Sequence, residues 1–324
     1  MEVVKAVVVV SPGSASALEL AEVERPLPGE RDIVIAVAAA GVNRADVHQR
    51  EGHYPPPEGA PHWPGLEVSG TVSWAGEHSG HAVGYRVCAL LPGGGYAEEV
   101  VVDGSLALSV PESVDLVDAA GLMEALCTVW SNVFLLAALR SGETLLVHGG
   151  SSGVGTMAVQ LGRAFGARVA VTASNDVKLS ACRGLGADIL IDYTMEDFVE
   201  RIEAEGGADV ILDLVGASYL QRNVRALRVD GRIANIASAG GAPAQIDLGL
   251  LMRKRGTLRS TSLRARPLAE KADIVASVHE NVWPLLENGT IRPVTGARFP
   301  LADAAEAHRL MESSDHIGKI LLTV

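Results

Sequence analysis

The chain has 324 residues, of which 48% are hydrophobic and 20% charged; it is long enough for two domains with real cores and is unlike a disordered chain. Its 27 basic and 39 acidic residues leave a formal net charge of −12. This charge repels phosphate backbones and anionic lipid, which excludes nucleic acid and a membrane surface as expected partners. The three cysteines, Cys88, Cys127 and Cys182, show no C-x-x-C spacing, which favours a reducing, cytoplasmic compartment.

Two apolar segments could be mistaken for targeting or membrane signals. The first, residues 6–10, is shorter than the core of a secretion signal, so we expect a first strand there. The longest, residues 125–139, is interrupted by Thr128, Ser131 and Asn132 and is shorter than the roughly twenty residues that span a bilayer. We therefore expect neither a secretion signal nor a transmembrane segment.

The first third of the chain consists of short apolar runs separated by proline and glycine. Tight punctuation of this kind is typical of a β barrel or sandwich rather than of helices. The expected strands are residues 6–10, 33–37, 67–74, 86–91 and 96–102.

After Pro111 the pattern changes to strands separated by helical stretches. This alternation predicts an α/β domain with a doubly wound parallel sheet. We place that domain at residues 122–262 and expect residues 1–121 and 263–324 to form the other domain. The six expected strands are residues 144–148, 168–172, 189–192, 210–214, 232–235 and 257–260.

A glycine-rich loop follows the first of these six strands and opens a helix. Gly153, Gly155 and Ala158 occupy the G-x-G-x-x-G/A positions, which allow a tight turn, a close approach of the backbone to a pyrophosphate, and helix packing. The pyrophosphate would lie at the helix N-terminus, where N–H groups and the helix dipole favour negative charge. Because a strand precedes and follows this motif as required, the sequence predicts a dinucleotide site; a purely structural glycine turn is the alternative.

The end of the second strand indicates which dinucleotide binds. An NAD-selective site needs a carboxylate about twenty residues past the loop, but Ala173 stands there. Ser174 and Lys178 follow, and they favour the 2′-phosphate of NADPH. Against this, Lys178 is equally typical of an exposed helix lysine, and Asp176 is an acid close by. We expect NADPH as the cofactor.

Six short strings of the sequence resemble those of a known family. They are GVNRAD (41–46), QREGHYPPP (49–57), GLEVSG (65–70), LPGGGYA (91–97), SGVGT (152–156) and HIGKI (316–320). With these strings, the chain resembles the zinc-independent quinone oxidoreductases of the medium-chain dehydrogenase/reductase superfamily, in particular the tumour-suppressor-inducible subgroup. The resemblance implies a GroES-like β-rich catalytic domain, a six-stranded Rossmann domain, and a homodimer or homotetramer formed through the Rossmann-domain edges.

The resemblance also indicates whether the chain has the ligands of a zinc site. Zinc-dependent relatives have Cys where Asn43 stands and His where Leu66 stands, and no four clustered thiolates are present for a structural zinc. The histidine pairs 48/53 and 78/81 lack a third ligand at sensible spacing, so we expect them to be solvated and expect no metal site. Without a metal to polarise an alcohol, the expected acceptor of hydride is electron-poor, either a quinone or an activated enone.

Three residues are expected to be catalytic, each with a simpler alternative. Asn43 is expected to orient the substrate or nicotinamide, or else to cap the helix at 44–49. Tyr54 is expected to stack on a flat quinone or donate a proton, or else to fill the cleft mouth. Ser152 is expected near cofactor and substrate, or else to make loop hydrogen bonds. Arg44 and Asp46 are expected to form a local ion pair.

The resemblance further implies a set of cofactor contacts around a cleft between the two domains. Tyr193 is expected to cover the 2′-phosphate, and Lys319 is expected to be a weaker anion contact. The expected cofactor-binding residues are Thr128, Gly150, Ser151, Ser152, Gly153, Val154, Gly155, Ser174, Lys178, Tyr193, Asp213, Ile236, Ser262, Leu263 and Arg264.

These observations predict an NADPH-dependent, zinc-free quinone oxidoreductase in which Tyr54 or solvent supplies a proton. Two alternatives stay open. One is an NADPH-dependent enoyl or enone reductase, which uses the same cofactor geometry. The other is a crystallin-like protein that binds NADPH without useful turnover.

Overall fold

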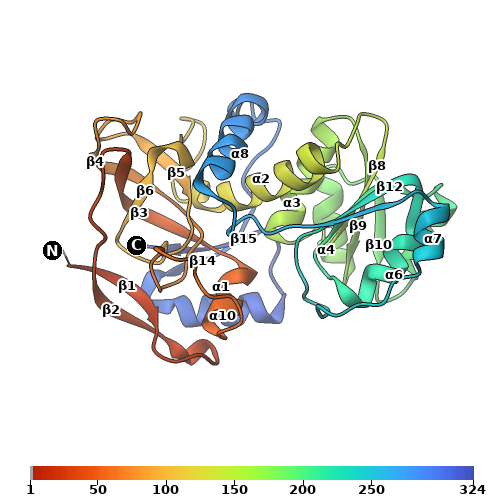
Figure 1. Cartoon of the computed structure of the whole chain (residues 1–324), viewed down its shortest axis with the longest axis horizontal. Coiled ribbons are helices and arrows are strands. Elements are labelled where there is room, and N and C mark those ends of the chain that lie inside the picture. The colour runs from red at the N-terminus through yellow and green to blue at the C-terminus, as the bar shows by residue number, and fades with distance from the viewer. Residues whose placement is uncertain (1–2) are drawn as a thin grey trace. The chain divides into compact units, whose positions relative to one another are not determined.

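The computed structural model describes residues 3–324, which divide into two units (Figure 1). The first unit comprises the described residues up to Cys127 together with Leu263–Val324, and the second is Thr128–Ser262. The second unit begins a few residues later than the expected 121/122 boundary. The reason is that residues 122–127 pack on the first unit, where the backbone N–H of Glu124 donates to Glu67 Oε2 at 2.9 Å.

The first unit is built on two β-sheets. Strands β1 (Val3–Val9) and β2 (Leu18–Glu24) pair antiparallel. The larger sheet has the order β14-β15-β3-β4-β5-β7, with β6 also paired to β3. Its strands are β3 (Asp32–Val42), β4 (Glu67–Ala75), β5 (Arg86–Leu90), β6 (Glu99–Asp103), β7 (Ala107–Ser109), β14 (Thr295–Pro300) and β15 (Lys319–Thr323).

Strand β15 brings the C-terminal segment into this sheet, since Ile320 pairs with Val42 and Leu322 with Ala40. The first unit is therefore discontinuous in sequence. Its helices are η1 (Ala15–Ala17), α1 (Arg44–Arg50), η2 (Gly104–Leu106), η3 (Asp118–Gly121), α2 (Met123–Val129, which runs into the second unit), α8 (Leu268–Asn281), α9 (Trp283–Glu287), η5 (Leu301–Asp303) and α10 (Ala304–Ser313).

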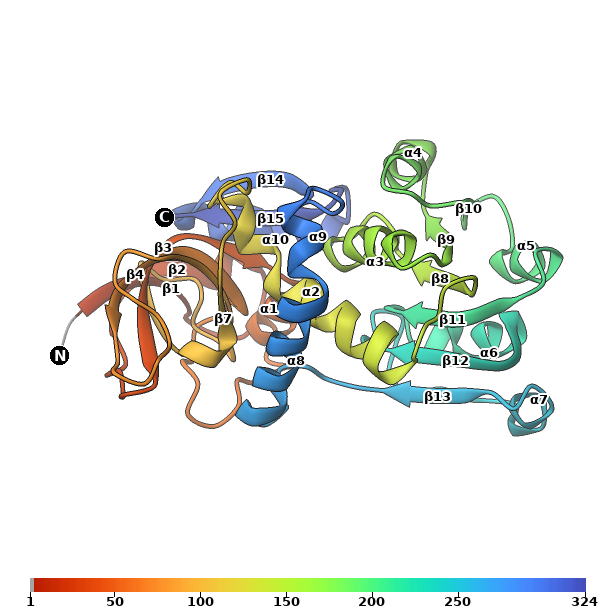
Figure 2. The same ribbon diagram turned by 90° about the horizontal axis from the view of Figure 1, so that it is seen from above.

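The second unit holds one parallel sheet with the order β10-β9-β8-β11-β12-β13. Counted from β8, this order is the 3-2-1-4-5-6 arrangement of a doubly wound dinucleotide-binding sheet. Helices α3 and α4 lie on one face and α5 and α6 on the other (Figure 2). The strands are β8 (Thr144–His148), β9 (Arg168–Ala173), β10 (Ile189–Asp192), β11 (Ala208–Asp213), β12 (Leu227–Asn235) and β13 (Thr257–Ser260). The helices are η4 (Trp130–Leu136), α3 (Gly153–Ala164), α4 (Asp176–Gly184), α5 (Phe198–Ala204), α6 (Ala217–Ala226) and α7 (Leu248–Arg253).

The six strands expected for this domain are all present, so the predicted α/β fold with a six-stranded parallel sheet is confirmed. The sheet is hydrophobic on both faces, as a parallel sheet covered by helices must be. Leu146, Ile189 and Ile211 lie in its core with Phe198 and Val224 from the covering helices.

One helical stretch, Asp118–Leu136, is long and apolar enough to cross a membrane, with a mean hydropathy of 1.5 over its most apolar window. However, 78% of that window is buried within the folded chain. Burial of this extent is typical of a core helix.

Candidate active site

The glycine loop between β8 and α3 has little room for side chains. A Cβ on Gly150 would lie 2.7 Å from Val171 Cβ, and one on Gly155 would lie 2.2 Å from the Gly149 carbonyl oxygen. Neither position accepts a larger residue without backbone movement. The loop therefore carries no side chain at Gly150 and Gly155, beside the start of α3. The first N–H groups of a helix have no intrahelical acceptor and attract phosphate.

Ser152 caps this helix. Its Oγ accepts a hydrogen bond from the backbone N–H of Gly155 at 3.0 Å, so the loop role given as the alternative for Ser152 is present. Ser151 is buried beside it, while Gly153 and Val154 begin the helix. The loop as a whole fits a pyrophosphate.

The residues expected around the adenosine 2′-phosphate come together at the carboxyl ends of β9 and β10. Lys178 Nζ donates to Ser174 Oγ at 3.3 Å, and the N–H of Tyr193 donates to the carbonyl of Ala173 at 3.2 Å. Asn175 caps α4 by accepting from the Lys178 N–H at 3.0 Å. Lys178 and Ser174 are thus in contact just after Ala173, which stands where an NAD-selective site has a carboxylate, and the backbone of Tyr193 lies beside Ala173. Asp192 pairs with Ala173 in the sheet, and Asp176 lies in the first turn of α4.

Asp213 is fully buried at the end of β11 and shapes the next turn. Its Oδ1 accepts from the N–H groups of Val215 at 2.8 Å and Gly216 at 3.0 Å. Ile236, at the end of β12, donates its N–H to the Asp213 carbonyl at 2.9 Å. Asp213 therefore orients the sheet edge at which ligands of such folds gather.

Thr128 and Ser262 lie at the two ends of the second unit. The Thr128 carbonyl accepts from Asn132 Nδ2 at 2.9 Å, and Asn132 Oδ1 in turn accepts from Thr261 Oγ1 at 2.6 Å. This chain of hydrogen bonds joins Thr128, near the end of α2, through Asn132 to Thr261, the residue directly before Ser262.

In the first unit, Asn43 is part of a buried charged cluster. Lys319 Nζ forms an ion pair with Glu67 Oε1 and donates to Asn43 Oδ1 at 2.7 Å. Asn43 Nδ2 donates to Glu67 Oε1 at 3.1 Å. Glu67 is 0% and Lys319 is 6% exposed, so each buried charge has its opposite charge and further hydrogen-bond partners, as burial requires.

This cluster does not fit a catalytic zinc ion. Leu66 offers no ligand atom, both polar side-chain atoms of Asn43 are engaged, and the Lys319 ammonium lies against it. Zinc sites use thiolate, imidazole or carboxylate donors, and a neighbouring ammonium opposes a dication.

A second buried chain of hydrogen bonds runs through the first unit from Arg50 to Asp46. Arg50 Nη1 lies 3.5 Å from His308 Nδ1, His308 Nε2 lies 3.1 Å from Tyr96 Oη, and Tyr96 donates to Asp46 Oδ2 at 3.1 Å. Because Tyr96 donates its proton to Asp46, His308 Nε2 must carry a proton to donate to the tyrosine oxygen.

Burial is the largest influence on the pKa of two members of this chain, Asp46 and His308. It raises the pKa of Asp46 to about 6, against the opposing effect of hydrogen bonds from Asn43, Gly65 and Tyr96. Burial, reinforced by the nearby Arg50 charge, lowers the pKa of His308 to about 3. His308 is therefore neutral at ordinary pH.

The expected ion pair between Arg44 and Asp46 is wrong. Arg44 Nη2 donates to the Met311 carbonyl at 2.6 Å, whereas Asp46 accepts from the N–H groups of Asn43 at 2.8 Å and Gly65 at 3.0 Å. Asp46 Oδ2 reaches back to the Asn43 N–H and so caps the start of α1, which uses the carboxylate within its own turn.

Tyr54 is partly buried on a loop held by Arg264. The Arg264 guanidinium lies 5.1 Å from the centre of the Tyr54 ring, a cation–π distance. Its Nε donates to the Pro92 carbonyl at 2.6 Å, its Nη1 to the Tyr54 carbonyl at 3.3 Å, and its Nη2 to Gln49 Oε1 at 2.7 Å. Arg264, expected among the cofactor contacts, thus holds the Tyr54 loop, and Leu263 beside it is buried.

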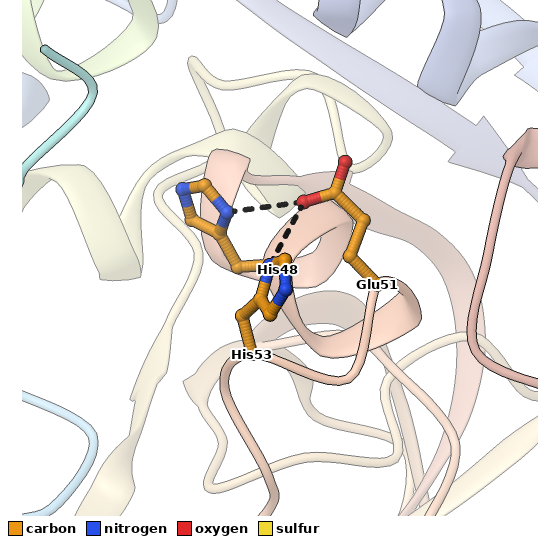
Figure 3. Close-up of side chains that lie close together, drawn as sticks. All are labelled: His48, Glu51 and His53. Atoms are coloured by element: carbon orange, nitrogen blue, oxygen red, sulfur yellow. Dashed lines mark hydrogen bonds and ion pairs between the residues drawn. The ribbon is translucent and has the colours of Figure 1, made fainter. Parts of the chain in front are cut away.

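Two histidines that we expected to lack a third ligand do have one. The Glu51 carboxylate lies between His48 and His53 (Figure 3), with Oε2 at 3.4 Å and 3.7 Å from their Nδ1 atoms. The chain turns back after α1, which the spacing of the histidines does not reveal. His78 lies 3.9 Å from Glu30, and His81 is hydrogen-bonded to the Gly104 carbonyl.

Sequence reasoning missed the partners of Asn43 and Tyr96. Glu67 and His308 were not among the expected site residues, although Glu67 lies within an apolar strand, and a carboxylate is rarely buried there without a paired cation. A carboxylate within an apolar strand therefore indicates that Glu67 needs a buried cationic partner. Its partner Lys319 lies far along the chain and could be paired with it only by the structure.

Fold and site together define the medium-chain dehydrogenase/reductase class: a GroES-like β-rich unit and a doubly wound unit with a nucleotide loop. Residues 29–112 match the family "Alcohol dehydrogenase GroES-like domain", and residues 185–322 match "Zinc-binding dehydrogenase". The quinone oxidoreductase of Sus scrofa is 30% identical over 307 residues, covering 93% of this chain and 92% of that protein. The chain belongs to the quinone oxidoreductase branch of this superfamily, so the family predicted from the sequence is confirmed.

Solved structures agree with this assignment. A mycobacterial protein complexed with NADPH is 28% identical, with a TM-score of 0.90 over 99% of this chain and 100% of that one. The Escherichia coli quinone oxidoreductase complexed with NADPH is 26% identical, with a TM-score of 0.87 over the whole of both chains.

Other relatives are much longer. The mycocerosic acid synthase-like polyketide synthase of Mycobacterium tuberculosis is 30% identical over 319 residues, which cover 97% of this chain. The chain spans only 15% of the length of that synthase.

Proposed function

We propose that this chain is an NADPH-dependent quinone oxidoreductase that works without zinc. The observation that carries the proposal is the glycine loop at the start of α3, together with Ala173 at the position where an NAD-selective site has a carboxylate and with the Ser174–Lys178 contact beside it, in a chain of the quinone oxidoreductase branch. The relatives complexed with NADPH support the same cofactor.

Bound NADPH supplies a hydride from its nicotinamide, and the protein contributes binding and orientation. The bare backbone at Gly150 and Gly155 holds the pyrophosphate, and Lys178, Ser174 and Tyr193 hold the 2′-phosphate. Asp213 and Ile236 keep the sheet edge in shape beside the cofactor.

The first unit contributes the acceptor-binding residues. Tyr54 stacks on a flat quinone, with its loop fixed by Arg264. Asn43 is held in one orientation by Lys319 and Glu67 and orients the substrate or nicotinamide. One hydride from NADPH and one proton reduce the quinone to its hydroquinone and leave NADP⁺, and Tyr54 or solvent supplies the proton.

A second candidate, reduction of an activated carbon–carbon double bond, has support from one observation. Over 97% of its length, the chain matches a segment of the mycocerosic acid synthase-like polyketide synthase described above. We propose that a segment of this kind reduces carbon–carbon double bonds during synthesis of the acid. Such a reduction uses the same hydride donor and also adds one proton.

Steady-state oxidation of NADPH with separate panels of ortho-quinones, enones and aldehydes tests the function. Quinones are expected to give the highest kcat/KM. Tyr54→Phe keeps the ring and removes the hydroxyl, so it is expected to lower kcat if Tyr54 supplies the proton and to leave KM nearly unchanged if the ring stacks. Tyr54→Ala is expected to raise KM for quinones if the ring stacks. Highest kcat/KM with enones would establish the second candidate. Tight NADPH binding without turnover on any panel would refute both enzymatic functions and leave the crystallin-like alternative.

The cysteines indicate a compartment for this protein, and an exposed strand indicates how copies of it assemble. Cys88, Cys127 and Cys182 are buried and unbridged, which supports a reducing cytoplasm. Strand β13 is at the edge of the sheet of the second unit, and all four of its residues are exposed. An exposed edge strand is a ready partner for a second copy, so we expect a homodimer or homotetramer by light scattering.

A further inference from the structure

His48, Glu51 and His53 lie together where α1 ends. His48 is in the last turn of α1, and Glu51 directly follows the helix. Gly52, with φ of +83°, adopts the left-handed conformation that turns the chain back, which places His53 beside its two neighbours. Figure 3 shows both imidazole rings directed at the same carboxylate.

The ligand atoms are close to the spacing of a metal site. Glu51 Oε2 lies 3.4 Å from His48 Nδ1 and 3.7 Å from His53 Nδ1, and one ligand atom from each residue lies within 4.8 Å of the other two. Tetrahedral zinc with bonds of about 2.0 to 2.2 Å separates its ligand atoms by roughly 3.3 Å. Small side-chain rotations are enough to reach that geometry.

The backbone that carries these residues is already ordered. The N–H of Glu51 donates to Val47 at 2.9 Å, that of Gly52 to Gln49 at 3.0 Å, and that of His53 to the His48 carbonyl at 2.8 Å. A metal ion would therefore not have to order the turn. The site also lies at a helix C-terminus, where the dipole favours a cation.

The neighbouring arginine leaves the Glu51 charge available. Arg50 Nη2 is 3.3 Å from Glu51 Oε1, on the oxygen that does not face the histidines. Arg50 is already paired with Glu312, at 2.7 Å and 3.1 Å, so its charge is largely compensated. Oε1 is held by the arginine while Oε2 faces the imidazoles, and an oriented carboxylate of this kind is typical of metal ligands.

The chemistry and exposure of the three side chains point to one class of ion. Two imidazoles and a carboxylate are the donor set of His₂Glu zinc sites, which leave a fourth position for water. Imidazole suits zinc, copper and nickel, whereas calcium and magnesium prefer oxygen donors. The His48 side chain is 43% and the His53 side chain 75% exposed, so an ion can enter from solvent.

We propose that His48, Glu51 and His53 bind one divalent transition-metal ion of the zinc type at the end of α1. This site does not include Asn43 or Leu66, and its ion takes no part in hydride transfer. Within residues 3–324 it is the single cluster of three such ligands. The pair His78 and Glu30 offers a matched comparison, because it has one histidine and one carboxylate at 3.9 Å and no third donor.

Calorimetric titration of the full chain, freed of metal by a chelator, with Zn²⁺ tests the proposal. The wild-type protein is expected to bind one equivalent. His53→Ala and Glu51→Gln are each expected to weaken binding by roughly tenfold or more, because each removes one of three ligands. His78→Ala is expected to bind as the wild type does.

Co²⁺ absorption and thermal unfolding supply independent readouts. Bound Co²⁺ is expected to show ligand-field bands without thiolate charge-transfer bands, and Zn²⁺ is expected to raise Tm of the wild type but not of His48→Ala/His53→Ala. All three side chains are at the surface, so the variants are expected to fold, which circular dichroism and NADPH binding check.

Three results would overturn the proposal. They are the absence of Zn²⁺ binding by the wild type, equal binding by the double histidine variant, and a thiolate spectrum that assigns the ion to a cysteine.

Discussion

At the scale of single residues, the first unit contains charged side chains that are buried away from solvent. Glu67 and Lys319 are tolerated in the interior because they pair with each other and with Asn43. Removing one partner of such a pair leaves an uncompensated charge, which costs far more than the pair itself contributes. This difference allows the cluster to be tested.

Lys319→Met is expected to lower the free energy of unfolding by about 3 to 5 kcal/mol, because Glu67 is left charged and buried. Urea denaturation measures the loss. The double variant Glu67→Gln/Lys319→Met is the control and is expected to recover much of the stability. A single variant as stable as the wild type would show that the ion pair does not hold the cluster together.

His308 predicts a pH dependence of stability. Its folded-state pKa of about 3 lies below its ordinary value, so between about pH 3 and 6.5 the unfolded chain binds a proton that the folded chain does not. The stability that neutral His308 contributes is present above that window and is lost as the pH falls through it. Asp46, with a pKa raised to about 6, has the opposite sign, because its contribution is lost as the pH rises.

The difference between wild type and His308→Gln isolates the histidine. Gln retains a donor toward Tyr96 but does not titrate. The stability advantage of the wild type is expected to shrink by about 1.4 kcal/mol per pH unit as the pH falls from about 6.5 to 4.5. Urea denaturation across this range measures it. An advantage that stays constant with pH would contradict a neutral, buried His308.

Lys178→Ala tests the 2′-phosphate corner. A charge-assisted hydrogen bond to phosphate contributes about 1.5 to 3 kcal/mol, so Kd for NADPH is expected to rise by roughly tenfold or more. Kd for NADH is expected to change little, because NADH has no 2′-phosphate. Fluorescence titration with both cofactors measures this. An equal change for both, or no change for NADPH, would remove Lys178 from the site.

At the scale of elements, the loop at the start of α3 depends on the absence of side chains. Gly155→Ala would place a Cβ against the Gly149 carbonyl oxygen, 2.2 Å away, so the loop must shift and NADPH affinity is expected to fall by at least about tenfold. Gly184→Ala, where a Cβ meets nothing within 4 Å, is the matched control. Equal affinities of the two variants would show that the loop does not approach the cofactor.

The elements differ in how well the sequence predicts them. The six strands of the second unit were all predicted, although β12 begins five residues earlier than expected. Strands β8 to β11 contain compact apolar runs between turn residues, whereas β13 (TLRS) is exposed throughout and was predicted as part of the strand–helix alternation. Strands β2 (Leu18–Glu24) and β14 (Thr295–Pro300) were not predicted, because they are largely exposed and carry polar residues. Their strand structure depends on pairing with distant strands, and local sequence does not contain that information.

The candidate site likewise contains residues that the sequence indicates and partners that it does not indicate. The glycine loop and the Ser174–Lys178 corner are local in sequence, so they could be proposed as cofactor contacts from the sequence alone. Two of the partners lie more than 200 residues away: Lys319 reaches Asn43 because β15 pairs with β3, and His308 reaches Tyr96 from α10. A single sequence indicates that Glu67 needs a cation but does not indicate which one.

At the scale of the whole molecule, the chain forms two units, and the first of them includes residues Leu263–Val324. We propose a different role for each unit. The second unit carries the glycine loop that we propose binds the dinucleotide, and the first carries Asn43 in a cluster with the Lys319 ammonium group. The reaction that we propose is hydride transfer from NADPH to a quinone without a catalytic metal.

NADPH oxidation with an ortho-quinone tests this reaction when the protein has been stripped of metal with a chelator and the removal has been verified by elemental analysis. We expect kcat and KM to equal those of the untreated protein, and we expect added Zn²⁺ not to raise kcat. Loss of turnover on removal of metal, restored by Zn²⁺, would contradict the proposed reaction.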